Sequence, residues 1–108
     1  AQCIVQTQQD LASSSLPCPI VGHVGDGNFH VIFVVDPDSP ADLAEVEMLN
    51  RRLMQRALDC GGTCTGEHGI GLGKKEYLAL EHPSGVPVMR AIKNALDPSG
   101  LLNPGKMF

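Results

Sequence analysis

The sequence predicts an α+β fold, in which helices pack on one face of an antiparallel sheet. Two strand-like runs rich in β-branched residues lie close together, at 20–24 and 29–35. Segments with apolar residues at helical spacing follow at about 40–60, 74–80 and 87–96. The 108 residues, of which 43% are hydrophobic and 19% charged, have the composition of one globular domain or a piece of one.

The first residues have the pattern of a helix that is already under way. Residues 1–12 carry this pattern, and the chain begins at Ala1 rather than at Met. From both features we expect a fragment of a longer protein, in which the absence of a recognisable targeting segment carries no information on location. A loop is predicted at 13–19, where three serines precede Pro17 and Pro19.

A tight hairpin is predicted next. Asp26-Gly27 lies between the strands 20–24 and 29–35, and Asp-Gly favours a two-residue type I′ turn because both central positions of that turn need positive φ. Both faces of 29–35 are apolar. We therefore expect this strand near the middle of a sheet, covered on both sides.

A long helix is predicted over about 40–60. Ser39 has the side chain of an N-cap, and Pro40 suits the first helical position, where a missing N–H costs nothing. Gly61-Gly62 is expected to end the helix. One apolar stripe at helical spacing should face inward. It consists of Leu43, Val46, Leu49, Leu53 and Ala57.

Two shorter helices are predicted in the second half. A short strand at Thr63–Thr65 would lead into a Gly-rich loop that ends at residue 73. The helices are expected at 74–80 and 87–96, and Asp97-Pro98-Ser99-Gly100 is a turn sequence. The tail 101–108 should be irregular but packed against the domain. The inward residues of the last helix are expected to be Val88, Ile92, Ala95 and Leu96.

Composition argues against two kinds of partner. The formal net charge of −4 leaves no basic patch for nucleic acid and no polybasic membrane anchor. The longest apolar run, Val31–Val35, is far shorter than the roughly 20 residues of a membrane-spanning helix. The four cysteines are expected to be free, mostly buried thiols of a reducing compartment. A soft-metal site at Cys60 and Cys64 is the alternative to packing for that pair.

Two histidines flank the predicted turn. With Asp26-Gly27 as a two-residue turn, His23 and His30 are directly opposed across the strands, with Cβ atoms about 4.5–5.5 Å apart. Two imidazoles at that spacing can bind one metal ion. Gly25 and Asn28 would form the next pair, leaving room above the site and offering a polar amide there. The alternative is that both histidines are ordinary polar residues of a sheet face.

Glu67 and His68 lie in the segment 65–71 of the Gly-rich loop. The flanking glycines let the backbone approach a ligand closely. Glu67 would complete a set of two histidines and one glutamate, which with one open position is the pattern of a catalytic zinc site. His68 could then face a substrate. The alternative is a solvated loop. Gly73-Lys74-Lys75 lacks the Ser or Thr of a phosphate-binding loop.

Three motifs, in this order, resemble the C-terminal signature of FAD-linked oxidases. They are Gly22–His30, Gly66–Gly71 and the tail motif Leu96–Lys106, and they extend over essentially the whole chain. That family holds D-lactate dehydrogenase, glycolate oxidase subunits and D-2-hydroxyglutarate dehydrogenase. Residues 61–68 are most similar to the mitochondrial D-lactate dehydrogenase branch. The resemblance implies that residues 1–108 are the C-terminal, ferredoxin-like part of the family's C-terminal domain, with the FAD-binding domain absent.

The resemblance also implies a role for single residues. His23, His30 and Glu67 match the ligands of a divalent metal, zinc or manganese, and His68 matches the general base. Asn103 belongs to the tail motif, which in this family lies near the flavin.

The implied reaction is oxidation of a small 2-hydroxy acid to a 2-keto acid. His68 would take the hydroxyl proton, and the C2 hydride would pass to FAD. Ile32 stands where relatives of the 2-hydroxyglutarate type carry Asn, which favours a monocarboxylate such as D-lactate. The resemblance further implies a mitochondrial location, an electron acceptor such as cytochrome c, and a fragment that is inactive alone. A non-enzymatic metal-binding module and an inactive truncated product are the alternatives.

Overall fold

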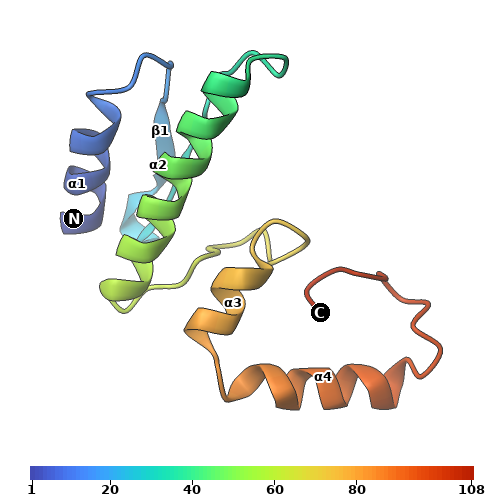
Figure 1. Ribbon diagram of the computed structural model, residues 1–108. Coiled ribbons are helices and arrows are strands. Elements are labelled where there is room, and N and C mark those ends of the chain that lie inside the picture. Colours follow the sequence, from blue (N-terminus) through green and yellow to red (C-terminus); the bar gives the residue numbers. More distant parts are fainter. The chain divides into compact units, whose positions relative to one another are not determined.

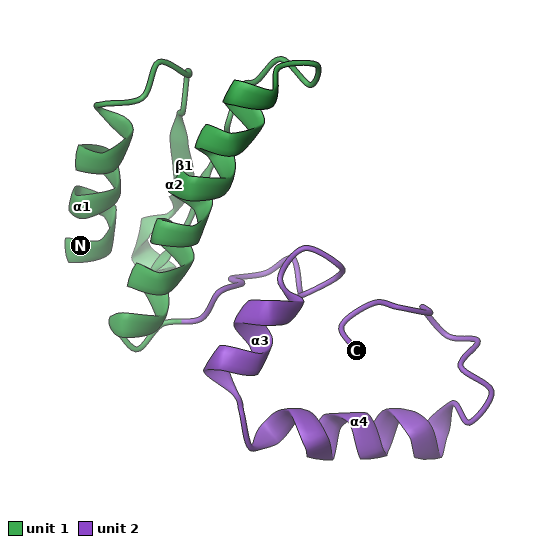
Figure 2. Cartoon of the chain, viewed as in Figure 1, with its two compact units in different colours: residues 1–62 green, residues 63–108 purple.

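The computed structural model describes all residues, 1–108, in two compact units, residues 1–62 and 63–108 (Figure 2). The predicted α+β class is confirmed, with four helices and one two-stranded antiparallel sheet (Figure 1). The packing of helices on one face of a ferredoxin-like sheet stays a prediction. None of the helices combines the length with the apolar composition that a bilayer crossing requires.

The elements are α1 (Gln2–Leu11), β1 (Ile20–His23), β2 (Asn28–Val31), α2 (Pro40–Asp59), α3 (Lys75–Glu81) and α4 (Gly85–Leu96).

Two prolines explain why the strands are shorter than predicted. The antiparallel pairing of β1 and β2 continues beyond their ends, because Ile32 N–H donates to Pro19 O and Val34 N–H donates to Pro17 O, both at 3.0 Å. The reciprocal bonds cannot form, since proline has no N–H. The predicted strand 29–35 therefore continues as extended backbone with only half of its ladder bonds.

The expectation of a central strand is wrong for this chain. β2 pairs with β1 alone, and beyond it Ile32 and Val34 are 48% and 53% exposed. The other expected strand, Thr63–Thr65, is also wrong. Its Cys64 N–H donates to the Glu81 carboxylate at 3.1 Å and not to a neighbouring strand. Apolar runs predicted strands here, but the chain supplies no third backbone for them to pair with.

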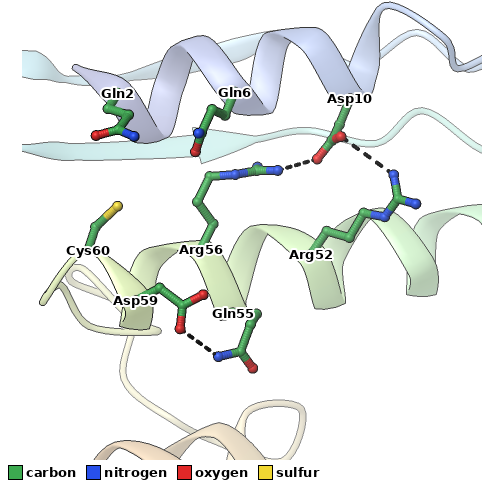
Figure 3. A pocket seen from close by; sticks show the side chains of 8 residues that line it. All are labelled: Gln2, Gln6, Asp10, Arg52, Gln55, Arg56, Asp59 and Cys60. Carbon is green, nitrogen blue, oxygen red and sulfur yellow. Dashed lines mark hydrogen bonds and ion pairs between the residues drawn. The ribbon is translucent and has the colours of Figure 1, made fainter.

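The first unit joins α1 to α2 through polar contacts (Figure 3). Asp10 of α1 forms ion pairs with two arginines of α2: with Arg56, and with Arg52, whose Nη1 lies 3.5 Å from Asp10 Oδ1 (Figure 3). Arg56 also donates to Thr7 Oγ1 at 3.0 Å. Asp10 thus bridges two arginines one turn apart. The residues of α2 that are buried are Leu49, Leu53 and Met54, whereas Leu43 of the expected stripe is 48% exposed.

Both ends of α2 match their predicted caps. Ser39 Oγ accepts the Asp42 N–H at 3.3 Å, and Pro40 follows as the first helical residue. At the other end Gly62 N–H donates to Ala57 O and Gly61 N–H donates to Leu58 O, both at 2.9 Å. These two bonds form a Schellman motif, which needs the positive φ of 72° found at Gly61.

The second unit has a small core at α3 and leaves α4 largely uncovered. Cys64, Tyr77 and Leu78 are buried. The expected inward residues of α4 are instead exposed, with Val88 at 60%, Ile92 at 55% and Leu96 at 78%. Periodicity identifies the apolar face of a helix, but covering it requires a packing partner, and the second unit provides none.

The tail is irregular, as predicted, but only its end is packed. Leu101 and Leu102 are 78% and 62% exposed, while Met107 and Phe108 are half-buried. Met107 N–H donates to Gly71 O at 2.7 Å, and the Arg90 guanidinium lies 5.5 Å from the centre of the Phe108 ring. The tail therefore returns to the Gly-rich loop.

All four cysteines are free thiols, but the expectation that most are buried is wrong. Cys64 alone is buried, Cys3 and Cys18 are half-buried, and Cys60 is exposed. Burial raises the pKa of the Cys3 and Cys64 thiols. Both therefore stay protonated and weakly nucleophilic at neutral pH.

The hairpin makes a stability prediction at Gly22, which pairs with Phe29. A Cβ there would lie 2.5 Å from Asn28 O and 2.5 Å from Phe29 Cα, so Gly22→Ala must push the strands apart. We expect a loss of about 1–3 kcal/mol in the free energy of unfolding, as for other overpacked sites. Gly25→Ala is the matched control, because no atom lies within 4 Å of its Cβ. Chemical denaturation that ranks the two variants equally would contradict this.

The turn 97–100 forms as predicted, with Gly100 N–H donating to Asp97 O at 3.0 Å. The Asp97 carboxylate pairs with Lys93 and accepts the N–H groups of Leu101 and Leu102, both at 2.9 Å. The Lys93 contact, followed by the Leu102 N–H, lowers the pKa of Asp97 from 3.8 to about 2.

The depressed pKa predicts how the stability of this turn depends on pH. Because the folded-state pKa lies below the ordinary value, the carboxylate stabilises the fold above pH 3.8, and this is lost as pH falls through about 2. Asp97→Asn should lower the melting temperature at pH 7, and the difference from wild type should vanish near pH 2. Asp38→Asn, at an exposed carboxylate, is the control. A difference that persists unchanged at pH 2 would contradict this assignment.

Candidate metal centre

The turn that joins the two strands is longer than predicted. Val24–Asp26 form a single 3₁₀ turn, and Gly27 follows in the left-handed region with φ 71°. Gly27 N–H donates to Val24 O at 3.1 Å. The connection is therefore a four-residue loop built on a helical turn, a common hairpin type, and not the expected two-residue type I′ turn. Gly27 supplies the positive φ that closes it.

This longer loop changes which residues face each other. His23 pairs with Asn28, and His30 pairs with Val21. The predicted direct opposition of His23 and His30 is wrong, as is the predicted pairing of Gly25 with Asn28. The shift is by two residues, however, and the side-chain period of a strand is also two.

Both histidines therefore remain on one face of the hairpin. They are diagonal neighbours, for which the typical separation is about 7–8 Å, somewhat less between Cβ atoms, and still within reach of long or aromatic side chains. His23 is exposed and His30 is half-buried. The hairpin thus presents two imidazoles on the same side, with Asn28 directly across from His23.

Glu67 and His68 lie in the Gly-rich loop of the second unit. His68 Nε2 is 3.5 Å from Glu67 Oε1, and their side chains are 75% and 48% exposed. Gly69 and Gly71 have φ of 75° and 55°, a conformation that glycine adopts without strain. Thr65 Oγ1 donates to Gly69 O at 2.9 Å, which closes the turn that carries Glu67 and His68.

The base of this loop is held by two charged residues that sequence reasoning missed. Lys74 Nζ donates to Cys64 O at 2.6 Å, and the Glu81 carboxylate accepts Cys64 N–H at 3.1 Å and Thr63 Oγ1–H at 3.0 Å. Desolvation opposes the charged form, yet the Cys64 and Thr63 hydrogen bonds lower the pKa of Glu81. The sequence feature that could have identified Lys74 and Glu81 is the placement of one charged residue at each end of the short helix α3.

Two further residues singled out in the sequence are solvent-exposed. Asn103 has φ 47° in the tail, where its carbonyl accepts the Lys106 N–H at 3.1 Å. Asn is the non-glycine residue that tolerates this region most readily. Ile32 follows His30 on the extended backbone beyond β2 and is 48% exposed.

The donor atoms of these residues fit a divalent cation. Two imidazoles and one carboxylate, with a fourth position left for substrate, form a ligand set typical of catalytic zinc. His23 and His30 lie on the hairpin of the first unit, and Glu67 lies beside His68 on the loop of the second unit. Each unit therefore carries side chains with donor atoms of the kind that zinc accepts.

Comparison with known proteins identifies the family. The family model described as FAD linked oxidases, C-terminal domain, matches residues 1–107. A probable mitochondrial D-lactate dehydrogenase of Danio rerio is 50% identical over 99% of this chain and 22% of its own length. A mitochondrial D-lactate dehydrogenase [cytochrome] of Arabidopsis thaliana is 44% identical over 100% of this chain and 19% of its own length.

A glycolate oxidase subunit GlcD of Bacillus subtilis is 42% identical over 81% of this chain and 19% of its own length. The chain thus spans about a fifth of the length of the curated relatives it matches. The chain also carries the histidine hairpin, which bears His23 and His30, and the Gly-Glu-His loop, which bears Glu67 and His68. The family model matches nearly every residue. This match shows that the chain belongs to the FAD-linked oxidase C-terminal domain family.

Proposed function

We propose that this chain is the C-terminal metal- and substrate-binding part of a flavin-dependent D-2-hydroxyacid dehydrogenase that oxidises D-lactate to pyruvate. The observation that carries the proposal is the placement of two histidines on one face of a hairpin, inside a chain of the FAD-linked oxidase family. The relatives from Danio rerio and Arabidopsis thaliana, both named D-lactate dehydrogenases, are 50% and 44% identical.

The preference for a monocarboxylate is supported by Ile32. This residue is two positions beyond His30 and is 48% exposed, so an apolar side chain borders the histidine hairpin. An alkyl group offers no hydrogen bond to a second carboxylate, which would lose its hydration without compensation. A short acid with a methyl group, such as D-lactate, has no such cost.

In the proposed mechanism each residue has a separate task. His23, His30 and Glu67 would hold the cation, zinc or manganese, and His68 would accept the proton of the substrate hydroxyl as general base. When bound, the cation would supply positive charge that favours ionisation of that hydroxyl, and FAD would supply the acceptor for the C2 hydride. The exposed His68 side chain is accessible to a substrate. Asn103, in the tail, would lie near the flavin.

The remainder of the flavoprotein would supply what these residues lack. The uncovered apolar face of α4 and the exposed Leu101 and Leu102 are surfaces that a neighbouring domain could bury. We also propose that FAD is bound mainly by another domain and that residues 1–108 are inactive alone. By analogy with relatives whose names include the words cytochrome and mitochondrial, we propose an electron acceptor such as cytochrome c and a mitochondrial location.

The assignment of neighbours Glu67 and His68 to different roles predicts different phenotypes in the complete flavoprotein. Glu67→Ala, like His23→Ala and His30→Ala, should lose metal and turnover together, since three ligands leave little redundancy. His68→Ala should keep metal and FAD, while turnover falls by roughly 10²–10⁴-fold, the usual effect of losing a general base. Elemental analysis beside steady-state rates measures both.

Glu76→Gln, at an exposed carboxylate of α3, serves as the control and should change neither property. A His68→Ala protein that is metal-free beside a metal-loaded Glu67→Ala protein would reverse the two roles. Metal binding without any reduction of bound flavin by D-lactate would instead favour the metal-binding module.

A further inference from the structure

We propose that Lys74 and Glu81 are positioning residues, which together fix the loop that bears Glu67 and His68. We call the pair the charged clamp. Its catalytic consequence rests on the function proposed above, whereas its structural effect does not.

The charged clamp binds both polar groups of one residue. Glu81 accepts the Cys64 N–H at 3.1 Å, and Lys74 Nζ donates to the Cys64 carbonyl at 2.6 Å. Lys74 is the N-cap of α3 and Glu81 is its last residue, so a single rigid helix sets the distance between the two charges. Residue 64 is thereby restrained at its donor and at its acceptor.

The position of residue 64 makes this restraint relevant to the candidate site. The Gly-rich loop begins at Thr65 and ends at Gly73, directly before Lys74. The contact between Lys74 and Cys64 therefore ties the end of the loop to its beginning. Within the loop, Gly69 and Gly71 add backbone freedom that would otherwise disperse the side chains of Glu67 and His68.

Burial makes the two contacts strong. Cys64 is 2% exposed and the Glu81 side chain 14% exposed. Hydrogen bonds with one charged partner are roughly twice as strong as neutral ones. Removing the Glu81 carboxylate would leave a buried N–H without a partner, which the loop can correct only by moving.

The test uses the complete flavoprotein with four variants: Glu81→Ala, Glu81→Gln, Lys74→Met and the control Glu76→Gln. Three properties are measured for each variant: amide hydrogen exchange of residues 65–73, Mn²⁺ affinity of the metal-stripped protein, and kcat and KM per bound flavin with D-lactate. The exchange measurement reports on the loop without any requirement for turnover.

We expect Glu81→Ala and Lys74→Met to speed exchange in 65–73 but not in 40–59. Mn²⁺ affinity and kcat should fall by about 10–100-fold, the usual effect of losing groups that orient a metal ligand, with a smaller change in KM. Glu81→Gln should recover most of the Mn²⁺ affinity and of kcat, because its amide oxygen can still accept the Cys64 N–H. Glu76→Gln should match wild type.

Two outcomes would overturn the proposal. The first is unchanged exchange in 65–73 in Glu81→Ala. The second is a Glu81→Ala protein with lower thermal stability but wild-type Mn²⁺ affinity and kcat, which would make the contact merely structural. A wild-type protein that neither binds Mn²⁺ nor is reduced by D-lactate would refute the proposed function instead. The exchange comparison would then still decide whether the clamp holds the loop.

Discussion

The register of the β1–β2 hairpin is the constraint on which the candidate metal site depends. A strand alternates its side chains between two faces, so a slip of one residue would place His23 and His30 on opposite sides. Gly27, with φ 71°, closes a four-residue loop that keeps both on one side. Gly22 reinforces the register, because the backbone of Asn28 and Phe29 approaches it too closely for any side chain.

The second unit is organised by charged side chains that bind backbone groups of irregular segments. Lys74 and Glu81 hold the backbone of Cys64, and Lys93 with Asp97 holds that of Leu101 and Leu102. In both cases the charges lie at or near the ends of a helix, and the segment that they bind has no ladder or helix bonds of its own. Such contacts allow a loop and a tail to keep defined backbones where the buried apolar core is small.

The exposed apolar residues show that sequence periodicity alone does not predict which residues are buried. The pattern of α4 correctly identifies an apolar face, yet Val88, Ile92 and Leu96 remain exposed. The same holds for Ile32 and Val34 beyond β2. Hydrophobic spacing reports which side of an element prefers to leave water, but burial also requires an opposing surface.

Local chemistry in the sequence determined the α+β class, the limits of α2 with its Ser39 cap and Gly61 stop, and the turn at 97–100, because each depends on residues close in the chain. It also identified the histidine hairpin and the Gly-Glu-His loop. Only the tertiary structure decided the diagonal relation of His23 and His30, since Asp-Gly is compatible with both a two-residue and a four-residue turn. It likewise decided that Glu81 contacts a residue 17 positions away, a contact that no local pattern encodes.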